Sequence, residues 1–300
     1  MSTATPETRV VLLENVHQRA VDVFDRAQNG TKYNVTRYMK ALEGAALVEA
    51  IRDAHIVGIR SKTTLPAEVL AEARSLYTIG AFCIGTNQID LDAAARLGIP
   101  VFNAPFSNTR SVAELTVAEA VALNRQLGDR TMEVHRGVWK KSADGCHEVR
   151  GRTLGIVGYG HIGSQVSIVA EAMGMRVVFY DVIDVLPLGN AERMRTLDAL
   201  LAISDVVTLH VPETPETKGM IGAAELAKMK EGAVLINNAR GTVVDIDALA
   251  AALKDGHLGG AAVDVYPEEP EANSAEGFKT PLQGMPNTIL TPHIGGSTLE

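Results

Sequence analysis

The sequence contains few cysteines, no long apolar run and no excess of basic charge, and each shortage narrows what this 300-residue chain can be. Two cysteines, Cys83 and Cys146, cannot make a disulfide framework, which favours a reducing, cytoplasmic location. No uninterrupted apolar run approaches the length that crosses a bilayer. The first residues also lack the charged-then-apolar pattern of a secretory signal, so we expect no association with a membrane.

The charge balance excludes a further class of partner. The 36 acidic residues exceed the 28 basic ones, and the formal charge of −8 argues against binding to nucleic acid. A small anionic substrate stays compatible with this charge where cations gather locally. The eight histidines show neither H-x₃-H nor H-E-x-x-H spacing, so no metal site is predicted. With 46% apolar residues, the chain can bury the cores of two domains or of one large α/β unit.

A glycine-rich turn dominates the second half of the chain. The apolar run Leu154–Val157 predicts a buried strand of a parallel sheet, and Gly158, Gly160 and Gly163 follow it at G-x-G-x-x-G spacing. These glycines allow a tight turn, the approach of a pyrophosphate to the backbone, and close packing of a helix on the strand. The strand pattern before the motif and the helix pattern after it supply the context that a dinucleotide site requires.

An acidic residue beyond this motif indicates which dinucleotide binds. A second apolar run, 176–180, ends at Asp181, eighteen residues after Gly163. A carboxylate there accepts hydrogen bonds from the adenosine ribose and repels a 2′-phosphate, while the helix N-terminus binds the phosphates. The sequence therefore predicts NAD rather than NADP as the cofactor.

Two series of alternating strand and helix patterns predict an α/β fold with two parallel, doubly wound sheets. We place the boundary near Pro105, with a flavodoxin-like substrate-binding domain at 1–105 and a Rossmann NAD-binding domain at 106–294. A long helix at 111–126 is expected to connect them. The predicted strands are 10–13, 32–36, 55–60, 76–79 and 100–102, then 154–157, 176–180, 206–211, 233–236, 260–264 and 288–290.

Three residues suited to acid–base or anion-binding chemistry follow strands of the second series. Ligands of open parallel sheets bind beyond the carboxyl ends of the strands, so Arg240, Glu269 and His293 are expected to converge. Arg240 can hold a carboxylate through two parallel hydrogen bonds. His293 can take a hydroxyl proton, and Glu269 can orient its imidazole and raise its pKa. Taken singly, each also has a structural explanation: a surface ion pair, a solvated acidic run or a turn residue.

Six segments together resemble the D-isomer-specific 2-hydroxyacid dehydrogenase family over nearly the whole chain. They are 85–115, LGIVGYGHIG at 154–163, LHVPETPETKGMI at 209–221, NNARGTVVD at 237–245, AAVDVYPEEP at 261–270 and LTPHIGGST at 290–298. The resemblance implies hydride transfer from C2 of a D-2-hydroxy acid to NAD, with Arg240, Glu269 and His293 as the catalytic residues. The implied cofactor site comprises Gly158, Gly160, His161, Ile162, Gly163, Asp181, His210, Pro212, Ala239, Arg240, Asp264, His293, Gly295 and Gly296.

Within the family, the chain resembles the members that oxidise 3-phospho-D-glycerate in serine biosynthesis, so a phosphorylated acid is the expected substrate. Arg60 and Arg110 are candidates for binding this substrate. Each also has a structural alternative: Arg60 can be an exposed strand end, and Arg110 a helix residue paired with Glu114. Two other functions stay open: a dehydrogenase for 2-hydroxyglutarate or glycerate, and a corepressor-like binding protein that responds to NAD. The residues assigned to the substrate are Arg60, Ser61, Ile84, Gly85, Asn108, Arg110 and Lys141.

The resemblance also carries expectations about assembly and length. The family forms homodimers or homotetramers through the NAD-binding domain, and Trp139 is expected to pack in a core or, in preference, at that subunit interface. The helix that the family places after about residue 295, which returns to the first domain, is expected to be missing or cut short. No serine-binding regulatory domain is expected within the chain.

Overall fold

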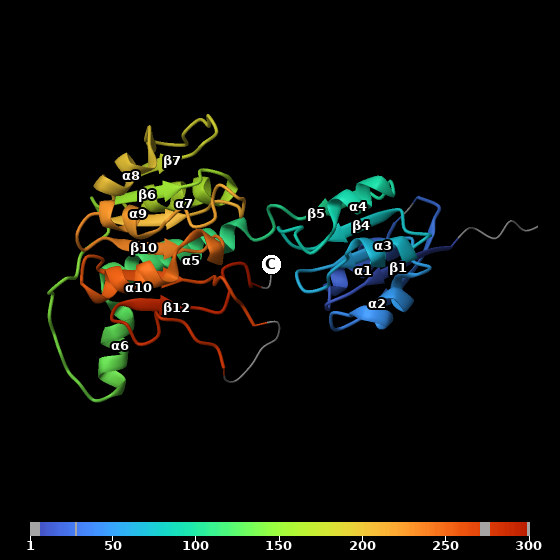
Figure 1. The fold of residues 1–300 in the computed structure, drawn as a ribbon, viewed down its shortest axis with the longest axis horizontal. Coiled ribbons are helices and arrows are strands. Elements are labelled where there is room, and N and C mark those ends of the chain that lie inside the picture. Colours follow the sequence, from blue (N-terminus) through green and yellow to red (C-terminus); the bar gives the residue numbers. More distant parts are fainter. Residues whose placement is uncertain (1–6, 28, 271–276, 299–300) are drawn as a thin grey trace, which may run out of the picture. The chain divides into compact units, whose positions relative to one another are not determined.

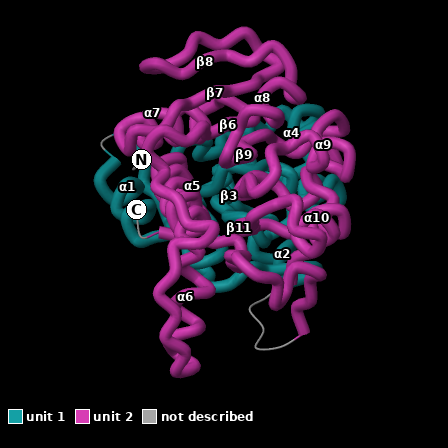
Figure 2. The backbone as a smooth tube through the Cα atoms, turned by 90° about the vertical axis from the view of Figure 1, so that its left-hand side faces the viewer, with its two compact units in different colours: residues 1–107 teal, residues 108–300 magenta. Residues whose placement is uncertain are grey.

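The computed structural model describes residues 7–27, 29–270 and 277–298, and the chain divides into two compact units, 1–107 and 108–300 (Figure 2). Every pairing between the described strands is parallel. Two parallel α/β sheets were predicted, and this fold class is confirmed. The sequence placed the boundary near Pro105, and the structure divides the chain after Ser107. The expectation that the return helix after about residue 295 is missing or cut short concerns residues that lie mostly outside the described part of the chain.

Unit 1 is a five-stranded sheet in the order β2-β1-β3-β4-β5. Side chains of β1 and of the residue after it alternate between two faces: Val10 and Leu12 pack in one cluster, Val11 and Leu13 in another. The order reverses between β1 and β3, the switch point of a flavodoxin-like sheet. The elements are β1 (Glu7–Leu12), α1 (Gln18–Asp25), β2 (Lys32–Arg37), α2 (Gly44–Ile51), β3 (Ile56–Ile59), α3 (Ala67–Glu72), β4 (Thr78–Ala81), α4 (Leu91–Arg96) and β5 (Val101–Asn103).

Unit 2 is a seven-stranded sheet in the order β12-β11-β10-β9-β6-β7-β8. Its order reverses between β6 and β9, as in a Rossmann fold, so the switch point lies beside the glycine-rich turn. The elements are α5 (Thr109–Asn124), α6 (Leu127–His135), β6 (Thr153–Val157), α7 (His161–Ala172), β7 (Arg176–Tyr180), β8 (Glu192–Arg193), α8 (Leu197–Ile203), β9 (Val206–Leu209), α9 (Ala223–Lys228), β10 (Val234–Asn237), a 3₁₀ turn (Gly241–Val243), α10 (Ile246–Lys254), β11 (Gly260–Val263) and β12 (Thr288–Leu290).

Figure 1 draws the helices and strands of unit 2 in green to red. Two apolar clusters flank its sheet. One contains side chains of α8, α9 and α10, and the other contains side chains of α5 and α7. All side chains of β6, β9, β10 and β11 are buried, because helices cover both faces of the sheet. This burial explains why the strands appear in the sequence as short, nearly continuous apolar runs.

Three elements depart from the predicted pattern. The helix α6 was not predicted, and none of its residues is buried within this chain. The two-residue strand β8 was not predicted either; both its side chains are exposed. The long connecting helix was predicted to begin at residue 111, but α5 begins at Thr109, so Arg110 lies in the first turn of a helix. Within the described residues, no helix has the length and apolar character needed to cross a membrane.

Candidate active site

All the residues that the sequence assigns to the cofactor and to catalysis follow the carboxyl ends of strands in unit 2. The glycine-rich turn follows β6, and Asp181 follows β7 directly. His210 and Pro212 follow β9, and Ala239 and Arg240 follow β10. Since the strands are parallel, these loops share one edge of the sheet, where ligands of such sheets bind. The remaining members, after β11 and β12, are Asp264, Glu269, His293, Gly295 and Gly296.

The three glycines of the turn have different surroundings. Gly158 has a φ of +91°, and a Cβ on it would stand 2.6 Å from the carbonyl oxygen of His210. A Cβ on Gly163 would stand 2.2 Å from the carbonyl oxygen of Gly158, so the helix packs directly on the turn. Around Gly160, in contrast, a Cβ would meet nothing within 4 Å. Gly158 and Gly163 are thus required by packing, whereas Gly160 faces open space before the first turn of α7.

Asp181 is partly exposed to solvent, and it also supports the glycine-rich turn. Its Oδ2 accepts a hydrogen bond of 2.7 Å from the Tyr159 N–H, and its Oδ1 accepts one of 2.9 Å from the Ile183 N–H. Each carboxylate oxygen can accept a further hydrogen bond. The ring of Tyr159 stacks on Phe179 with 3.9 Å between centroids, which attaches the turn to the core.

These observations fit a dinucleotide. The open space at Gly160 allows a pyrophosphate to approach the backbone, and the N-terminus of the 12-residue helix α7 offers N–H groups to it. Asp181 retains acceptor capacity for ribose hydroxyls.

His210 follows β9 at the same edge of the sheet. Its Nε2 shares a hydrogen bond of 3.0 Å with the Thr208 hydroxyl, and its buried Nδ1 has no hydrogen-bond partner in the described part of the chain. Burial lowers the pKa of His210 to about 3, so the ring is neutral.

The predicted pairing of Glu269 with His293 is present. The Nδ1 of His293 lies 2.8 Å from Oε2 of Glu269, and the other carboxylate oxygen accepts the Tyr266 N–H at 3.1 Å. Arg240 is close enough to affect the pKa of both side chains. Its Nη1 donates to the Ala239 carbonyl at 2.7 Å. The structure therefore brings all three predicted residues together.

This arrangement shifts both pKa values toward the charged forms. The hydrogen bond to the Glu269 carboxylate raises the pKa of His293 and outweighs the opposing effect of burial. Partial burial acts to raise the pKa of Glu269, but the hydrogen bonds from His293 and from the Tyr266 N–H outweigh it, so the pKa lies below its ordinary value. An imidazole with a raised pKa is a stronger base for taking a proton.

Asp264 holds the loop that carries His293. Its Oδ1 accepts from the Thr291 hydroxyl at 2.6 Å and from the Ile294 N–H at 2.8 Å. Its Oδ2 accepts the Gly295 N–H at 2.7 Å, and its carbonyl accepts the His293 N–H at 2.8 Å. His293 has a φ of +55°, an uncommon conformation for a residue with a side chain. The four bonds to Asp264 stabilise this strained backbone.

A buried polar group behind this edge was not predicted from the sequence. Glu119 in α5 is 3% exposed, and its Oε2 accepts from Nδ2 of Asn238 at 2.7 Å. The same amide donates to the Thr116 hydroxyl at 3.0 Å. Burial raises the pKa of Glu119 to about 7. The only sequence signal is an acid on the apolar side of a helix, and its partner lies 119 positions away.

The predicted substrate residues lie in both units. In unit 1, Arg60 and Ser61 follow β3 with exposed side chains, and Ile84 and Gly85 lie in the loop after β4. In unit 2, the Nδ2 of Asn108 is 1.9 Å from the position of a Cβ on Gly296, so these two residues are packed together.

The other two substrate candidates of unit 2 are more exposed. Arg110 forms an ion pair of 2.6 Å with Glu114, the alternative that the sequence left open. Lys141 is exposed in the segment after α6. Trp139 is 86% exposed in the single chain, so packing in a core is excluded, whereas the preferred position at a subunit interface stays a prediction.

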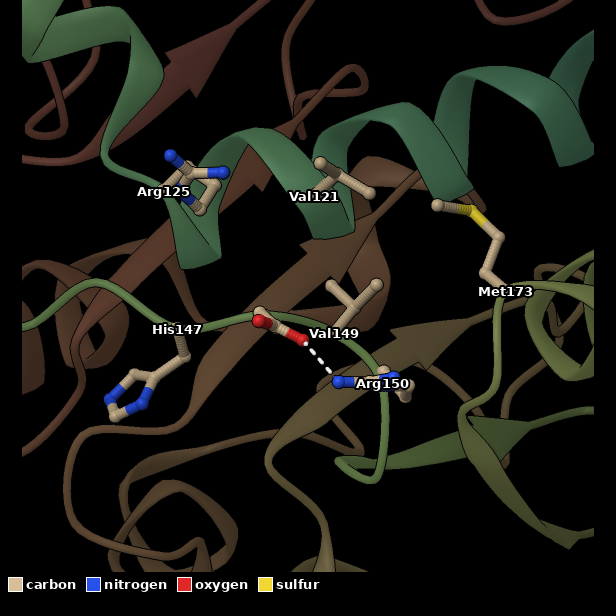
Figure 3. A pocket seen from close by; sticks show the side chains of 7 residues that line it. Val121, Arg125, His147, Val149, Arg150 and Met173 are labelled. Atoms are coloured by element: carbon tan, nitrogen blue, oxygen red, sulfur yellow. Dashed lines mark ion pairs between the residues drawn. The ribbon is translucent and has the colours of Figure 1, made fainter.

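A cavity of about 430 Å³ lies elsewhere on unit 2 (Figure 3). It is lined by side chains of Arg125, His147, Arg150 and Met173, and Arg150 pairs with Glu148 at 3.2 Å. These residues precede β6 or end helices, so the cavity lies at the amino edge of the strands. It contains none of the predicted site residues. Among the described residues, no group of three His, Cys, Asp or Glu side chains is arranged to hold a metal ion.

Comparison with known proteins identifies relatives of the whole chain. The family model for the NAD-binding domain of D-isomer specific 2-hydroxyacid dehydrogenases matches residues 117–295. D-3-phosphoglycerate dehydrogenase of Haemophilus influenzae is 59% identical over 97% of this chain and 70% of its own length. D-3-phosphoglycerate dehydrogenase 1 of Saccharomyces cerevisiae is 54% identical, over 99% of this chain and 64% of its own length. The chain thus spans about two thirds of these relatives.

Solved structures agree with these matches. D-lactate dehydrogenase of Aquifex aeolicus, in complex with NAD and lactic acid, has a TM-score of 0.80 and 30% identity, covering 97% of this chain and 90% of the other. The NAD complex of a D-isomer specific 2-hydroxyacid dehydrogenase from Lactobacillus delbrueckii has a TM-score of 0.81 and 30% identity, covering 97% and 91%. The dinucleotide expected from the glycine-rich turn is therefore NAD. The chain belongs to the D-isomer-specific 2-hydroxyacid dehydrogenase family and is an NAD-dependent oxidoreductase.

Proposed function

We propose that the chain oxidises 3-phospho-D-glycerate to 3-phosphohydroxypyruvate, the first step of serine biosynthesis. The relatives that support this substrate are D-3-phosphoglycerate dehydrogenases with 52–59% identity over 97–99% of the chain. The observation that carries the chemistry is the 2.8 Å contact between His293 and Glu269, with Arg240 near both, at the edge where this sheet binds NAD.

The three residues have separate roles in the proposed reaction. Arg240 binds the substrate carboxylate through its guanidinium group and orients C2. His293 takes the hydroxyl proton at Nε2, because its Nδ1 is held by Glu269. Glu269 keeps the imidazole oriented and stabilises the positive charge that develops on it. NAD, when bound, supplies the acceptor for the hydride that leaves C2.

The cofactor residues are assigned by position along the strand ends. Gly158, Gly160 and Gly163 admit the pyrophosphate, His161 and Ile162 present the first N–H groups of α7, and Asp181 accepts from the adenosine ribose. The assigned residues of the other loops are His210, Pro212, Ala239, Arg240, Asp264, His293, Gly295 and Gly296.

The substrate residues recognise the two anionic groups of the substrate. Arg60 and Ser61 bind the phosphate, and the backbone N–H groups at Ile84 and Gly85 bind the carboxylate. Asn108, Arg110 and Lys141 are further candidates for contact with the substrate. The ion pair between Arg110 and Glu114 must open for that role, whereas Arg60 and Lys141 are exposed.

The test of the substrate is the appearance of NADH absorbance with purified protein. Wild-type protein is mixed with NAD and, in turn, 3-phospho-D-glycerate, D-glycerate, D-2-hydroxyglutarate and D-lactate. The highest kcat/KM is expected for 3-phospho-D-glycerate. A higher value for any unphosphorylated acid overturns the proposed substrate. Bound NAD with no oxidation of any of the four points instead to a binding protein.

The assignment of Arg60 to the phosphate gives a sharper prediction. Arg60→Ala removes a charge-assisted hydrogen bond, so kcat/KM should fall by about 10- to 100-fold for 3-phospho-D-glycerate. For D-glycerate, which has no phosphate, the fall should be less than about threefold. Steady-state kinetics with both substrates measures this difference. Equal losses on both substrates would refute the assignment.

We also propose a homo-oligomer that assembles through the NAD-binding unit, and a cytoplasmic location. Apolar side chains that are exposed in a single chain support the assembly, since patches of this kind mark contact surfaces. They lie on and just after α6, and they are Leu127, Met132, Val134, Val138 and Trp139.

A further inference from the structure

A buried carboxylate in unit 1 has an unusual set of partners. Glu14 directly follows Leu13 at the end of β1 and is only 8% exposed. Its Oε1 accepts the N–H groups of Arg60 at 3.0 Å and of Thr63 at 2.8 Å, and its Oε2 accepts the N–H of Lys62 at 2.9 Å. All three donors belong to the loop after β3. The carboxylate therefore holds this loop by its backbone.

The backbone at Glu14 is strained to make these contacts. Glu14 and Asn15 have φ values of 59° and 52°, a left-handed conformation that favours glycine. Neighbouring carbonyls hold both residues there: the Glu14 N–H donates to Lys40 at 3.2 Å, and the Asn15 N–H donates to Tyr38 at 3.0 Å. Strain of this kind persists at sites where function requires one geometry.

The position of this network in the sheet points to ligand binding. Strands β1 and β3 pair directly, with Leu12 opposite Gly58, and the sheet order reverses between them. In doubly wound sheets the ligand crevice lies at that switch point, beyond the carboxyl ends. The loop held by Glu14 carries the exposed side chains of Arg60, Ser61 and Lys62 at this edge.

A second contact ties the same loop to the loop after β4. Nε2 of Gln88 donates to the carbonyl of Arg60 at 2.8 Å and lies 3.3 Å from the carbonyl of Gly85. The backbone of Arg60 is thus held on both sides: its N–H donates to Glu14, and its C=O accepts from Gln88. Both loops contain residues that are assigned to the substrate.

We propose that Glu14 is a positioning residue for recognition of the substrate phosphate, an inference that rests on the proposed function. Three converging N–H groups form a site for an anion. Glu14 fills that site from within, so the substrate phosphate is bound by the side chains of Arg60 and Ser61 rather than by the loop amides. The carboxylate also fixes the point from which the Arg60 side chain extends.

Two variants of the full 300-residue chain test this role. Glu14→Gly removes the carboxylate and relieves the left-handed strain, and Glu14→Gln keeps the shape but turns an amide N–H₂ toward the loop. In both, KM for 3-phospho-D-glycerate should rise at least about tenfold, since hydrogen bonds to a charged group are lost. The kcat value and the KM for NAD should change less than about threefold, because the catalytic trio and the cofactor loops belong to unit 2.

A matched control separates positioning from general loss of structure. Asn15→Gly relieves the same strain one residue later and leaves the carboxylate in place, so its KM should equal that of wild type. Sodium acetate should lower the KM of Glu14→Gly, because a small carboxylate can occupy the emptied N–H site, and should not lower that of Glu14→Gln. If Glu14→Gly acted instead through a general loss of structure, acetate would not lower its KM.

Hydrogen exchange gives a readout that does not depend on catalysis. The N–H groups of Lys62 and Thr63 should exchange at least about tenfold faster in both Glu14 variants than in wild type. Unchanged exchange, or a wild-type KM in both variants of an enzyme active on 3-phospho-D-glycerate, overturns the role of Glu14. Inactivity of wild type on that substrate overturns the proposed function, and with it the phosphate role. The exchange rates would then still decide whether Glu14 holds the loop.

Discussion

At the scale of single residues, the hydrogen bond between Glu269 and His293 links the protonation of two groups. The raised pKa of His293 means that the folded state binds its proton more tightly, so this stabilisation is present below about pH 6.5 and is lost as the pH rises through the folded-state value. The lowered pKa of Glu269 stabilises the fold above about pH 4.5, and this part is lost as the pH falls. The pair therefore contributes most between these limits.

Glu269→Gln should change the pH dependence of the reaction. Without the carboxylate, the pKa of His293 falls, so the acidic limb of kcat/KM for oxidation should move to lower pH. The maximal rate should drop by about 10- to 100-fold, because the imidazole is less basic and less well oriented. Rates measured from pH 5 to 10 test this. An acidic limb at the wild-type pH would contradict the assignment of that limb to His293.

Glu119 gives a residue-scale prediction about stability. Its pKa is raised to about 7 in the folded protein, whereas the unfolded chain ionises near 4.5. Wild type therefore loses stability as the pH rises from 4.5 to 7 and regains none above it. Glu119→Gln removes this penalty and should add about 3 kcal/mol to the free energy of unfolding at pH 8, with little gain at pH 4.

Urea unfolding at the two pH values measures the effect of Glu119→Gln. Glu231→Gln, at an exposed position, is the control and should change the free energy of unfolding by less than about 0.5 kcal/mol at either pH. An equal gain at pH 4 and pH 8 would show that ionisation of Glu119 is not its cause.

At the scale of the element, two glycines of the turn between β6 and α7 have different roles: Gly160 is needed for NAD binding, and Gly158 for folding. Gly160 faces open space, so Gly160→Ala should fold with wild-type stability but bind NAD at least about tenfold more weakly, because the methyl group blocks the pyrophosphate. Gly158→Ala places a Cβ 2.6 Å from the His210 carbonyl at a φ of +91° and should cost about 1–3 kcal/mol of stability.

Calorimetric titration with NAD and thermal unfolding of both variants measure the two effects. Normal NAD affinity in a folded Gly160→Ala variant would contradict the pyrophosphate assignment. Wild-type stability in Gly158→Ala would show that the turn can relax around the added methyl group.

Several elements of unit 2 follow from short-range patterns, and others do not. The strands were predictable because burial on both faces requires apolar runs, as at Leu154–Val157. The helix α6 was not, because its stability does not come from an apolar face within this chain. The start of α5 was misplaced because Asn108 makes no side-chain capping bond that marks the first turn.

At the scale of the whole molecule, each unit has its own apolar clusters: Val57 and Ile79 belong to one in unit 1, and Leu209 and Leu235 to one in unit 2. We therefore expect two transitions in differential scanning calorimetry. NAD at about 100 times its Kd should raise only the transition of unit 2, by about 5–10 °C. A single transition that shifts as a whole would contradict independent unfolding.

The sequence by itself determined the α/β class, the dinucleotide turn and the strand ends that carry Arg240, Glu269 and His293. Those features depend on local spacing, since buried strands need apolar runs and tight turns need glycine. The tertiary structure alone decided the contacts of Glu14 with the loop at 60–63 and of Glu119 with Asn238. These partners are 46 to 49 and 119 positions apart, and nothing local records which distant donors a buried carboxylate will find.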